Sequence, residues 1–406
     1  MDAFKNPFAP GAGTPPPELA GRAGIIEAAW VALRRVKDGR SAKSQMLLGL
    51  RGVGKTVLLN KLREVAESEG YLTVQLEAPE NRRLADMLVP ELRKVLLKLS
   101  AVERARNLAV RALGTLRSFA STFTMKVGEV EVGVTPDAIG ASGNLEIDLP
   151  DLLLEIAVAA KAAGRPVVIL IDEVQYLKSD DLSALLVAVH KIGQRGLPIV
   201  VFGAGLPLLA GLAGDAKSYA ERLFDFPGVG PLDRDAAIAA IREPIRHEGA
   251  DIVSDALVEI VQQTKGYPYF VQEWGSKAWN EAPSSPITRA DVERATGAAI
   301  KALDGGFFRV RLDRLTPRER DYLRAMATLG PGPHRSGDIA AALDARVSQV
   351  GPLRDGLIRK GMIYSPAFGD TAFTVPMFDD YMKRVMPQWK PPTAFADSRK
   401  KQGKKR

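Results

Sequence analysis

Residues 49–56 read GLRGVGKT and match the pattern G-x-x-x-x-G-K-[ST] at every fixed position. A strand-like apolar run, QMLLGL, leads into them, and an amphipathic stretch, TVLLNKLREVAE, follows. A strand, a glycine-rich loop and a helix in this order form a loop that cradles phosphate groups. This feature constrains the fold most, because such a loop belongs to a parallel sheet that is covered by helices.

The residue types of this loop suit a nucleoside triphosphate and a magnesium ion. Glycine lets consecutive backbone N–H groups curl round phosphate oxygens, and the positive end of the following helix dipole adds to the attraction. We expect Lys55 to reach the β- and γ-phosphates of ATP and the Thr56 hydroxyl to ligate Mg²⁺. The expected nucleotide-binding residues of the loop are Gly49, Arg51, Gly52, Val53, Gly54, Lys55 and Thr56.

A second pattern completes the predicted site. Residues 167–171 read as a buried strand, and Asp172 and Glu173 follow it directly. Ligands of open α/β sheets bind at the carboxyl ends of the strands. We therefore expect Asp172 to hold the Mg²⁺, directly or through water, and Glu173 to orient or deprotonate the water that attacks the γ-phosphate. The alternative is an Asp/Glu pair that is favoured at the N-terminus of a helix.

Short apolar runs alternate with longer helix-like stretches over residues 17–231, which predicts an α/β domain with the parallel sheet of a P-loop NTPase. The expected strands are residues 45–48, 72–76, 167–171 and 198–202. Alternation over residues 122–134 predicts a β-hairpin insertion at about residues 118–148, which we interpret as a surface elaboration.

The rest of the chain divides into a leader, a lid, a third domain and a tail. Residues 1–16 are rich in proline and glycine and predict a flexible leader. Residues 232–305 predict a helical lid, with Ser254 and Thr288 as expected N-caps. Its expected helices are residues 233–245, 254–264, 267–280 and 288–303.

Residues 306–388 have the order of a winged helix, in which three helices precede a β-hairpin. Thr316 and Glu319 enclose a proline at the first helical position, which is a capping box. The hairpin is expected from MIYSP and TAFTVP. Residues 389–406 lack apolar periodicity and predict a disordered basic tail.

The composition excludes several classes of site. The chain has no cysteine and only three histidines, which excludes disulfides, thiolate catalysis and cysteine-ligated zinc and argues against a histidine metal site. We expect a reducing, cytoplasmic setting.

An uncharged run at residues 196–214 contains five glycines and two prolines, so we interpret it as a buried strand that leads into a turn and expect no membrane span.

These segments occur in the order found in AAA+ ATPases, and the chain resembles the branch of origin-recognition-type initiators and STAND-type signalling ATPases. Residues 17–22 are similar to that branch's proline and Gly-Arg-Glu box, so the resemblance places Gly21 and Arg22 at the adenine pocket. Ala23 stands where the box has glutamate. Gly266-Tyr267-Pro268 resembles the G-x-P motif of STAND-type proteins, which assigns Pro268 to the nucleotide; a structural turn is the alternative.

The resemblance also bears on hydrolysis. Asp172 to Gln175 is similar to a D-E-x-Q variant, in which Gln175 contacts the water or a neighbouring subunit, or simply faces solvent. The family's sensor strand ends in a polar residue, whereas residues 200–205 here end in Gly-Ala-Gly, which implies slow turnover. Arg222 lies where the family carries an arginine finger, which implies a homo-oligomer; an exposed helix arginine is the alternative.

The charge pattern leaves the macromolecular partner open. The tail contributes seven Lys or Arg against one Asp, so of the net charge of +8 only +2 belongs to residues 1–389. A winged helix that reads double-stranded DNA would use Arg354, Arg359 and Lys360, with the tail attracting phosphates. Winged helices also bind proteins.

Two functions therefore compete at the level of the sequence. The first is an ATP-binding AAA+/STAND-like ATPase whose nucleotide state switches its oligomeric or conformational state and controls the winged helix on DNA or a protein partner. The second is a nucleotide-switched signalling or scaffold protein that has no contact with nucleic acid. A small-molecule kinase is disfavoured, because the two additional domains would be unexplained.

Overall fold

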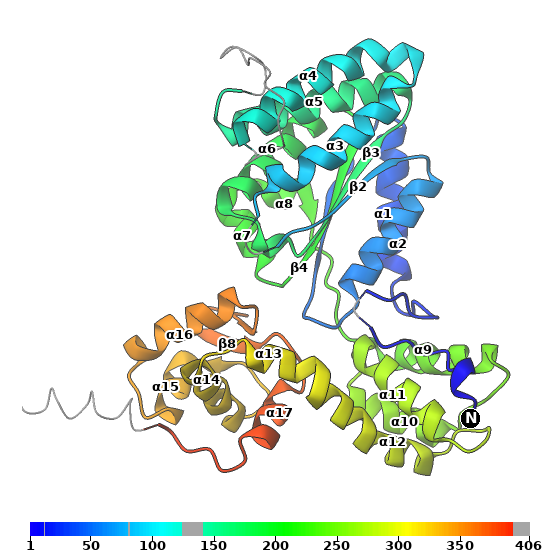
Figure 1. Ribbon diagram of the computed structural model, residues 1–406, viewed down its shortest axis with the longest axis vertical. Coiled ribbons are helices and arrows are strands. Elements are labelled where there is room, and N and C mark those ends of the chain that lie inside the picture. The colour runs from blue at the N-terminus through cyan, green and yellow to red at the C-terminus, as the bar shows by residue number, and fades with distance from the viewer. Residues whose placement is uncertain (12, 80–81, 124–140, 393–406) are drawn as a thin grey trace, which may run out of the picture. The chain divides into compact units, whose positions relative to one another are not determined.

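The computed structural model describes residues 1–11, 13–79, 82–123 and 141–392 (Figure 1). These residues form two compact units. We call the first the sheet unit; it comprises Ala20–Gly49 and Gly54–Gly230. The second, the helical unit, comprises Met1–Leu19, Leu50–Val53 and the described chain from Pro231 onward.

The sheet unit is built on a five-stranded parallel sheet in the order β2-β3-β4-β1-β5. Every residue of β3 and β4 is buried, which explains why both strands are almost entirely apolar. The prediction of a parallel α/β sheet is confirmed. The strands are β1 (Ser44–Leu48), β2 (Leu72–Glu77), β3 (Val167–Asp172), β4 (Ile199–Gly205) and β5 (Phe224–Asp225).

Helices cover the sheet on both faces, with α1 and α2 on one side and α3 to α6 on the other (Figure 1). The large apolar core lies between β2, β3 and β4 and helices α3 to α6. The helices of this unit are α1 (Ala23–Lys37), α2 (Lys55–Ser68), α3 (Leu84–Ser100), α4 (Arg106–Phe123), α5 (Leu145–Ala163), α6 (Ser179–Gln194), α7 (Leu209–Ala216) and α8 (Ala220–Leu223). Short 3₁₀ turns occur at Glu103–Ala105 and Val174–Tyr176.

The described part of the region predicted as a hairpin insertion contains no strand: it is helical at both ends, and residues 141–144 have no regular secondary structure. Residues 118–123 belong to the end of α4, and residues 145–148 to the first turn of α5. Phe119 of α4 is fully buried, so its apolar residues follow a helical face and not a strand. Residues 124–140, which carry most of the predicted hairpin, lie outside the described residues.

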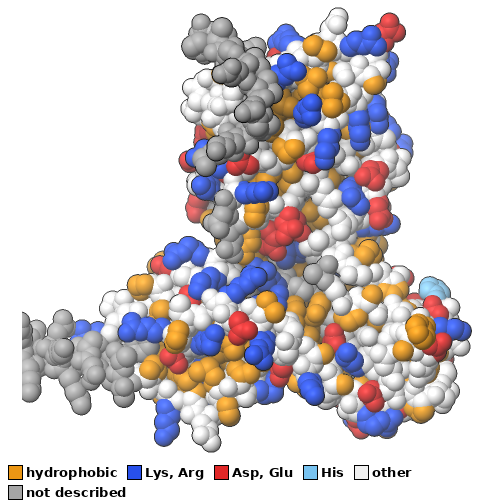
Figure 2. All heavy atoms as spheres, in the orientation of Figure 1, with side chains coloured by type: hydrophobic (Ala, Val, Ile, Leu, Met, Phe, Trp, Pro, Cys, Tyr) orange, Lys and Arg blue, Asp and Glu red, His pale blue; other side chains and the backbone are white. Residues whose placement is uncertain are grey.

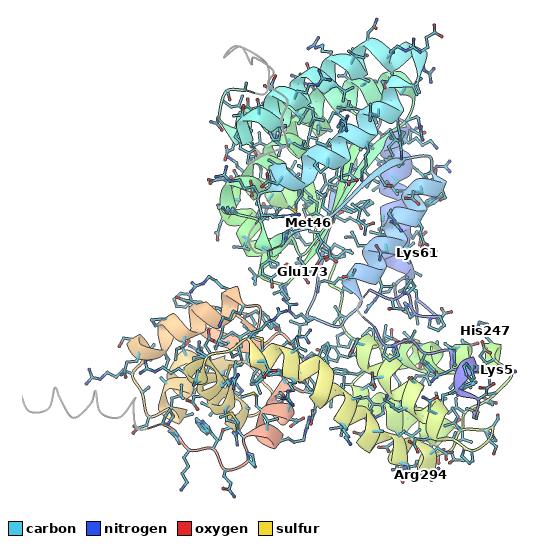
Figure 3. All side chains as sticks on the ribbon, in the orientation of Figure 1. Lys5, Met46, Lys61, Glu173, His247 and Arg294 are labelled. Carbon is cyan, nitrogen blue, oxygen red and sulfur yellow. The ribbon has the colours of Figure 1, made fainter. Side chains whose placement is uncertain are left out.

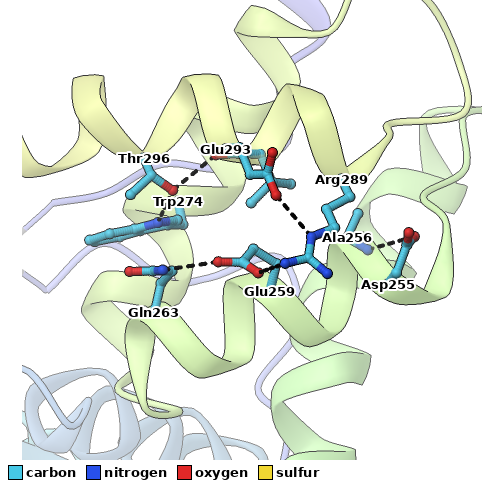
Figure 4. Close-up of polar contacts among 9 residues, drawn as sticks. Asp255, Ala256, Glu259, Gln263, Trp274, Arg289, Glu293 and Thr296 are labelled. Atoms are coloured by element: carbon cyan, nitrogen blue, oxygen red, sulfur yellow. Dashed lines mark hydrogen bonds and ion pairs between the residues drawn. The ribbon is translucent and has the colours of Figure 1, made fainter.

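The lid of the helical unit contains the predicted helices as α9 (Arg234–His247), α10 (Ser254–Thr264), α11 (Pro268–Glu281) and α12 (Arg289–Ala302). Thr288 caps α12 through a capping box with Asp291. Ser254 is not the cap of α10 but its first residue, because Val253 holds the cap position. Arg289 joins two helices by ion pairs with Glu259 at 3.1 Å and Glu293 at 2.9 Å (Figure 4).

The first residues of the chain, which the sequence predicts to be a flexible leader, pack on α11. They form a 3₁₀ turn at Ala3–Lys5. The Phe8 side chain is 5% exposed and lies directly over Gly275. The Asn6 amide donates to the backbone oxygen of Ser276 at 3.1 Å, and the Trp279 indole donates to the Asp2 carbonyl at 2.8 Å. One aromatic ring and a few polar contacts thus order a segment whose composition alone suggests disorder.

The last domain has the expected helices and an antiparallel sheet in the order β6-β8-β7. The capping box forms, with the Thr316 N–H donating to the Glu319 carboxylate at 2.8 Å. The elements are α13 (Arg309–Asp313), α14 (Pro317–Thr328), β6 (His334–Arg335), α15 (Ser336–Ala342), α16 (Val347–Arg359), β7 (Ile363–Tyr364), β8 (Asp370–Phe373) and α17 (Phe378–Val385). A π-helical turn, Leu303–Phe308, precedes them. This arrangement confirms the winged-helix layout, and α17 is an addition that the sequence pattern did not predict.

Among the described residues, no helix combines the length and the apolar character that crossing a membrane requires.

Candidate functional site

The glycine-rich loop connects β1 to α2, and two of its glycines hold backbone conformations that other residues avoid. Gly52 has a φ of +82° and Gly54 a φ of +88°. Gly54 is also the N-cap of α2, which begins at Lys55. Lys55 is 7% exposed, and its ammonium group donates to the Gly49 carbonyl at 3.0 Å. The loop therefore places the lysine and the start of a helix at one place, as a phosphate site requires.

Thr56 and Asp172 meet at the carboxyl end of the sheet, although 116 positions separate them in the chain. The Thr56 hydroxyl donates to Asp172 Oδ2 at 2.6 Å, and the Glu173 N–H donates to Asp172 Oδ1 at 2.8 Å. Burial raises the pKa of Asp172, while the hydrogen bond from Thr56 opposes the rise. A hydroxyl and a carboxylate at this distance are the hard oxygen donors that suit Mg²⁺.

Glu173 follows β3 in the left-handed region, with φ +53° and ψ +38°. A residue other than glycine in this conformation costs about 1–3 kcal/mol, and such strain concentrates at functional sites. Figure 3 shows Glu173 at the strand end of the sheet unit, and Lys61 farther along α2. The Glu173 carboxylate accepts a hydrogen bond from the Gln175 side-chain amide.

The strand expected to carry a polar sensor residue ends in small residues for a packing reason. Gly203 and Gly205 are fully enclosed within β4. A Cβ atom at Gly203 would overlap the Met46 sulfur, and one at Gly205 would lie 2.7 Å from the Gln175 side-chain oxygen. The space beside β4 is thus filled from β1 and from the turn after β3. Sequence reasoning missed the contact between Gln175 and β4, and the glycine at 205 was the only signal for it.

Comparison with known proteins identifies the sheet unit. Residues 18–202 match the family model of the AAA ATPase domain. This segment belongs to the AAA+ family. Residues 305–382 match a second model, a domain of unknown function (DUF8462). The predicted resemblance to AAA+ ATPases is thereby confirmed for the first of these segments.

Two relatives extend beyond the AAA domain. An uncharacterized HTH-type transcriptional regulator of Methanocaldococcus jannaschii is 24% identical over 347 residues, which are 82% of this chain and 80% of the relative. The structure of a Walker-type ATPase of Pyrococcus abyssi is 17% identical and covers 91% of this chain and 98% of its own, with a TM-score of 0.56. The chain shares its fold with this second protein.

Three further predicted residues, Gly21, Arg22 and Arg222, belong to the sheet unit. Arg22 caps α1, is 8% exposed, and donates from its guanidinium to the Gly230 carbonyl; it follows Gly21, which has a φ of +69°. Arg222 lies exposed on the short helix α8, just before β5 at the edge of the sheet beside β1.

Pro268 begins α11 in the lid of the helical unit. The preceding Gly266 has a φ of +72°, and its carbonyl accepts from the Leu232 N–H at 2.8 Å. A Cβ at Gly266 would overlap the Leu232 carbonyl. These contacts account for the glycine and the proline as a turn between helices, which was the structural alternative for the motif.

Two of the three residues expected to contact DNA form hydrogen bonds or ion pairs with other residues of the winged-helix domain. The Arg354 guanidinium donates to Thr371 Oγ1 at 3.0 Å, and the Lys360 ammonium lies 2.7 Å from the Glu319 carboxylate of the capping box. Arg359 is exposed at the end of α16. Arg354 in the middle of α16 therefore joins the helix to β8, and Lys360 at its C-cap joins it to α14, which a list of basic residues does not reveal. Of the predicted tail, residues 393–406 lie outside the described residues.

Proposed function

We propose that this chain binds ATP together with Mg²⁺ and hydrolyses it to ADP and phosphate. The observation that supports this most is the meeting of Thr56, Asp172 and Lys55 beside a loop of left-handed glycines. The AAA+ membership of residues 18–202 agrees with it. ATP fits the site by charge, since backbone N–H groups, an ammonium group and a helix N-terminus all favour phosphate oxygens.

Each residue would have a separate task in the bound state. The loop N–H groups of Gly49 to Thr56 hold the phosphates, and Lys55 leaves the Gly49 carbonyl to neutralise the β- and γ-phosphates. Thr56 and Asp172 would hold the magnesium ion, which neutralises charge on the phosphate oxygens when it is bound.

Glu173 is the general base of the proposed reaction. Its carboxylate takes a proton from water while the water oxygen bonds to the γ-phosphorus, and the bond from that phosphorus to the bridging oxygen of ADP breaks. Turnover is slow, because β4 ends in Gly-Ala-Gly and supplies no side-chain donor to the transferring group. A slow ATPase suits a switch, in which the nucleotide sets the oligomeric or conformational state and Arg222 reaches a second copy.

The switch controls the winged-helix domain, and DNA is the first candidate for its target. The similarity to an uncharacterized HTH-type transcriptional regulator, over 82% of this chain, supports this choice. The second candidate is a protein partner, as in a signalling or scaffold protein. The internal contacts of Arg354 and Lys360 favour it, because they remove two cations from the helix that would enter the groove.

The test of the nucleotide site compares Lys55→Ala with Lys61→Ala, a control on the same helix whose side chain is exposed at 46% and pairs only with Glu64 within its helix. We expect Lys55→Ala to abolish measurable ATP binding in equilibrium titration and Lys61→Ala to leave it unchanged. Glu173→Gln should retain binding and lower the hydrolysis rate by roughly 10²–10⁴-fold, the usual contribution of a general base. Equal ATP affinity in Lys55→Ala and the unaltered chain would overturn the assignment.

A further inference from the structure

The turn after β3 is tied to the end of β4 by a single side chain. Gln175 donates from its amide nitrogen to the Glu173 carboxylate, and its amide oxygen accepts from the Leu206 N–H at 3.0 Å. Both ends of the amide are therefore used, one on the proposed base and one on the backbone. A solvent-facing glutamine would have neither contact.

The same peptide unit also fixes the start of the phosphate loop. The Gly205 carbonyl accepts from the Gly49 N–H at 3.1 Å, and the N–H of the next residue, Leu206, is the group that holds Gln175. One peptide plane thus connects the first glycine of the loop to the amide that holds Glu173. A chain of hydrogen bonds therefore links the Glu173 carboxylate to Gly49, the first glycine of the loop.

Gly205 is required for this arrangement on steric grounds. A Cβ atom there would lie 2.7 Å from the Gln175 amide oxygen and 2.8 Å from Leu209 Cδ2. A Cβ atom at these distances forces Gln175 Oε1 and Leu209 to shift, and a shift of Oε1 away from β4 would lengthen its hydrogen bond with the Leu206 N–H. Gly205 at the end of β4 therefore leaves the space that the Gln175 side chain occupies.

We propose that Gln175 is the positioning residue for Glu173. It holds the carboxylate, which stands on a strained left-handed backbone, at a fixed place relative to the phosphate loop, and Gly205 leaves the space for its amide. This inference rests on the proposed ATPase function. Fixing a base within a few tenths of an ångström preserves the geometry of attack on the γ-phosphorus.

The test uses the full chain and measures ATP affinity and the single-turnover rate of hydrolysis separately. Gln175→Glu keeps an oxygen for Leu206 but replaces the donor that faces Glu173, and Gln175→Leu removes both contacts. We expect both to lower the rate by about tenfold or more, in the range typical of residues that orient catalytic groups, with ATP affinity within about twofold. Gln194→Leu, the same change at an exposed position of α6, should alter neither quantity.

Two double variants separate positioning from mere structural support. If Gln175 acts through Glu173, adding Gln175→Leu to Glu173→Gln should lower the rate no further, because coupled residues are not additive. Gly205→Ala should also lower the rate in the unaltered chain, and its further effect in a Gln175→Ala background should be smaller, because only the close contact with Leu209 Cδ2 then remains.

The outcomes distinguish this inference from the function on which it rests. An unchanged rate in Gln175→Leu, or an equal further loss in the Glu173→Gln background, overturns the role of Gln175 while the ATPase stands. If the unaltered chain neither binds nor hydrolyses ATP, or if Glu173→Gln hydrolyses it normally, the proposed function itself is wrong.

Discussion

At the scale of single residues, Asp172 shows the conflict between stability and a binding site. Its carboxyl is 7% exposed, and burial raises its pKa. Folding therefore disfavours the charged form of this side chain. Two hydrogen bonds, from Thr56 and from the Glu173 N–H, offset only part of that cost. The charge of Lys55 also favours the carboxylate, and a bound Mg²⁺ would favour it further.

We therefore predict that Asp172→Asn stabilises the nucleotide-free chain. The amide keeps the shape of the side chain: its oxygen can accept from the Glu173 N–H and its NH2 can donate to the Thr56 hydroxyl, but it carries no charge to bury. Removing a functional charge of this kind typically gives about 1 kcal/mol, which raises Tm by about 2–4 °C in a domain of this size. Thermal unfolding without nucleotide measures the effect, and the gain from adding Mg²⁺ with ATP should fall in the same variant.

The stability gain of Asp172→Asn should depend on pH, because the pKa of Asp172 is raised in the folded state. Since the pKa of Asp172 is higher in the folded state than in the unfolded state, the destabilisation is absent below the unfolded pKa near 4, grows as the pH rises from that value to the folded pKa, and is complete above it. The advantage of Asp172→Asn should thus be present at pH 7 and vanish near pH 4. An advantage that persists undiminished in acid would contradict a charge-based cause.

At the scale of elements, the sequence predicts those features that depend on local pattern. Strands β1 to β4 and helices α9 to α12 lie where periodicity places them, and the N-cap at Thr288 and the capping box at Thr316 form as expected. The short strands β5 and β6 and helix α17 were not predicted, because two to eight residues carry too little periodicity.

The residues of the candidate site likewise fall into those that a local motif predicts and those that only the folded structure brings together. Lys55, Thr56 and Asp172 could be predicted because each belongs to a motif with a fixed spacing. The contact of Gln175 with Leu206 and the retention of Arg354 by Thr371 join segments that are remote in sequence, so no local pattern announces them. The ordered N-terminal segment was missed for the same reason, since its partner Gly275 lies more than 260 residues away.

That segment supports a prediction about the lid. Phe8 is buried against Gly275, so Phe8→Ala should destabilise α11 by about 3 kcal/mol, the lower end for removal of a buried phenylalanine. Hydrogen exchange of the α11 amides in the full chain measures it. Phe4→Ala is the matched control, because the Phe4 side chain is fully exposed and its loss should leave exchange unchanged.

The effect of Gly275→Ala on hydrogen exchange of α11 should depend on whether residue 8 is phenylalanine or alanine. In the unaltered chain Gly275→Ala places a Cβ atom 2.7 Å from the Phe8 ring, so it should speed exchange of α11. In the Phe8→Ala background the same change should slow exchange, because alanine is better than glycine in a helix by about 1 kcal/mol. Equal effects in both backgrounds would show that Phe8 does not pack on α11.

At the scale of the whole molecule, the net charge of +8 gives a misleading impression of a basic surface. Lys and Arg side chains are interspersed with acidic and apolar ones on the face drawn in Figure 2. Several exposed cations also have carboxylate neighbours, such as Lys43 with Asp225 at 3.2 Å. Of the residues predicted to contact DNA, the basic tail and Arg359 remain candidates for binding a phosphate backbone.

We predict that the tail supplies most of the salt dependence of duplex DNA binding and the winged helix the remainder. Each phosphate contact adds about 0.9 to the slope of log affinity against log salt. Deleting residues 390–406, with their seven Lys or Arg, should lower the slope by up to about 6 while binding at low salt persists. Fluorescence anisotropy of labelled duplex DNA at several salt concentrations measures both quantities.

The truncated chain then decides between the two partners of the switch. If α16 faces DNA, Arg359→Ala should weaken the binding that remains after truncation, whereas Arg195→Ala, an exposed arginine that caps α6 in the sheet unit, should not. If the truncated chain does not bind, the tail alone attracts phosphates, and the winged helix is left for a protein partner. Absence of binding by the full chain at low salt, with and without ATP, would remove DNA from the proposed function. The proposed target of the nucleotide switch would then be a protein. The hydrogen bonds of Arg354 with Thr371 and of Lys360 with Glu319 agree with that outcome, because they occupy two of the cations predicted to contact DNA.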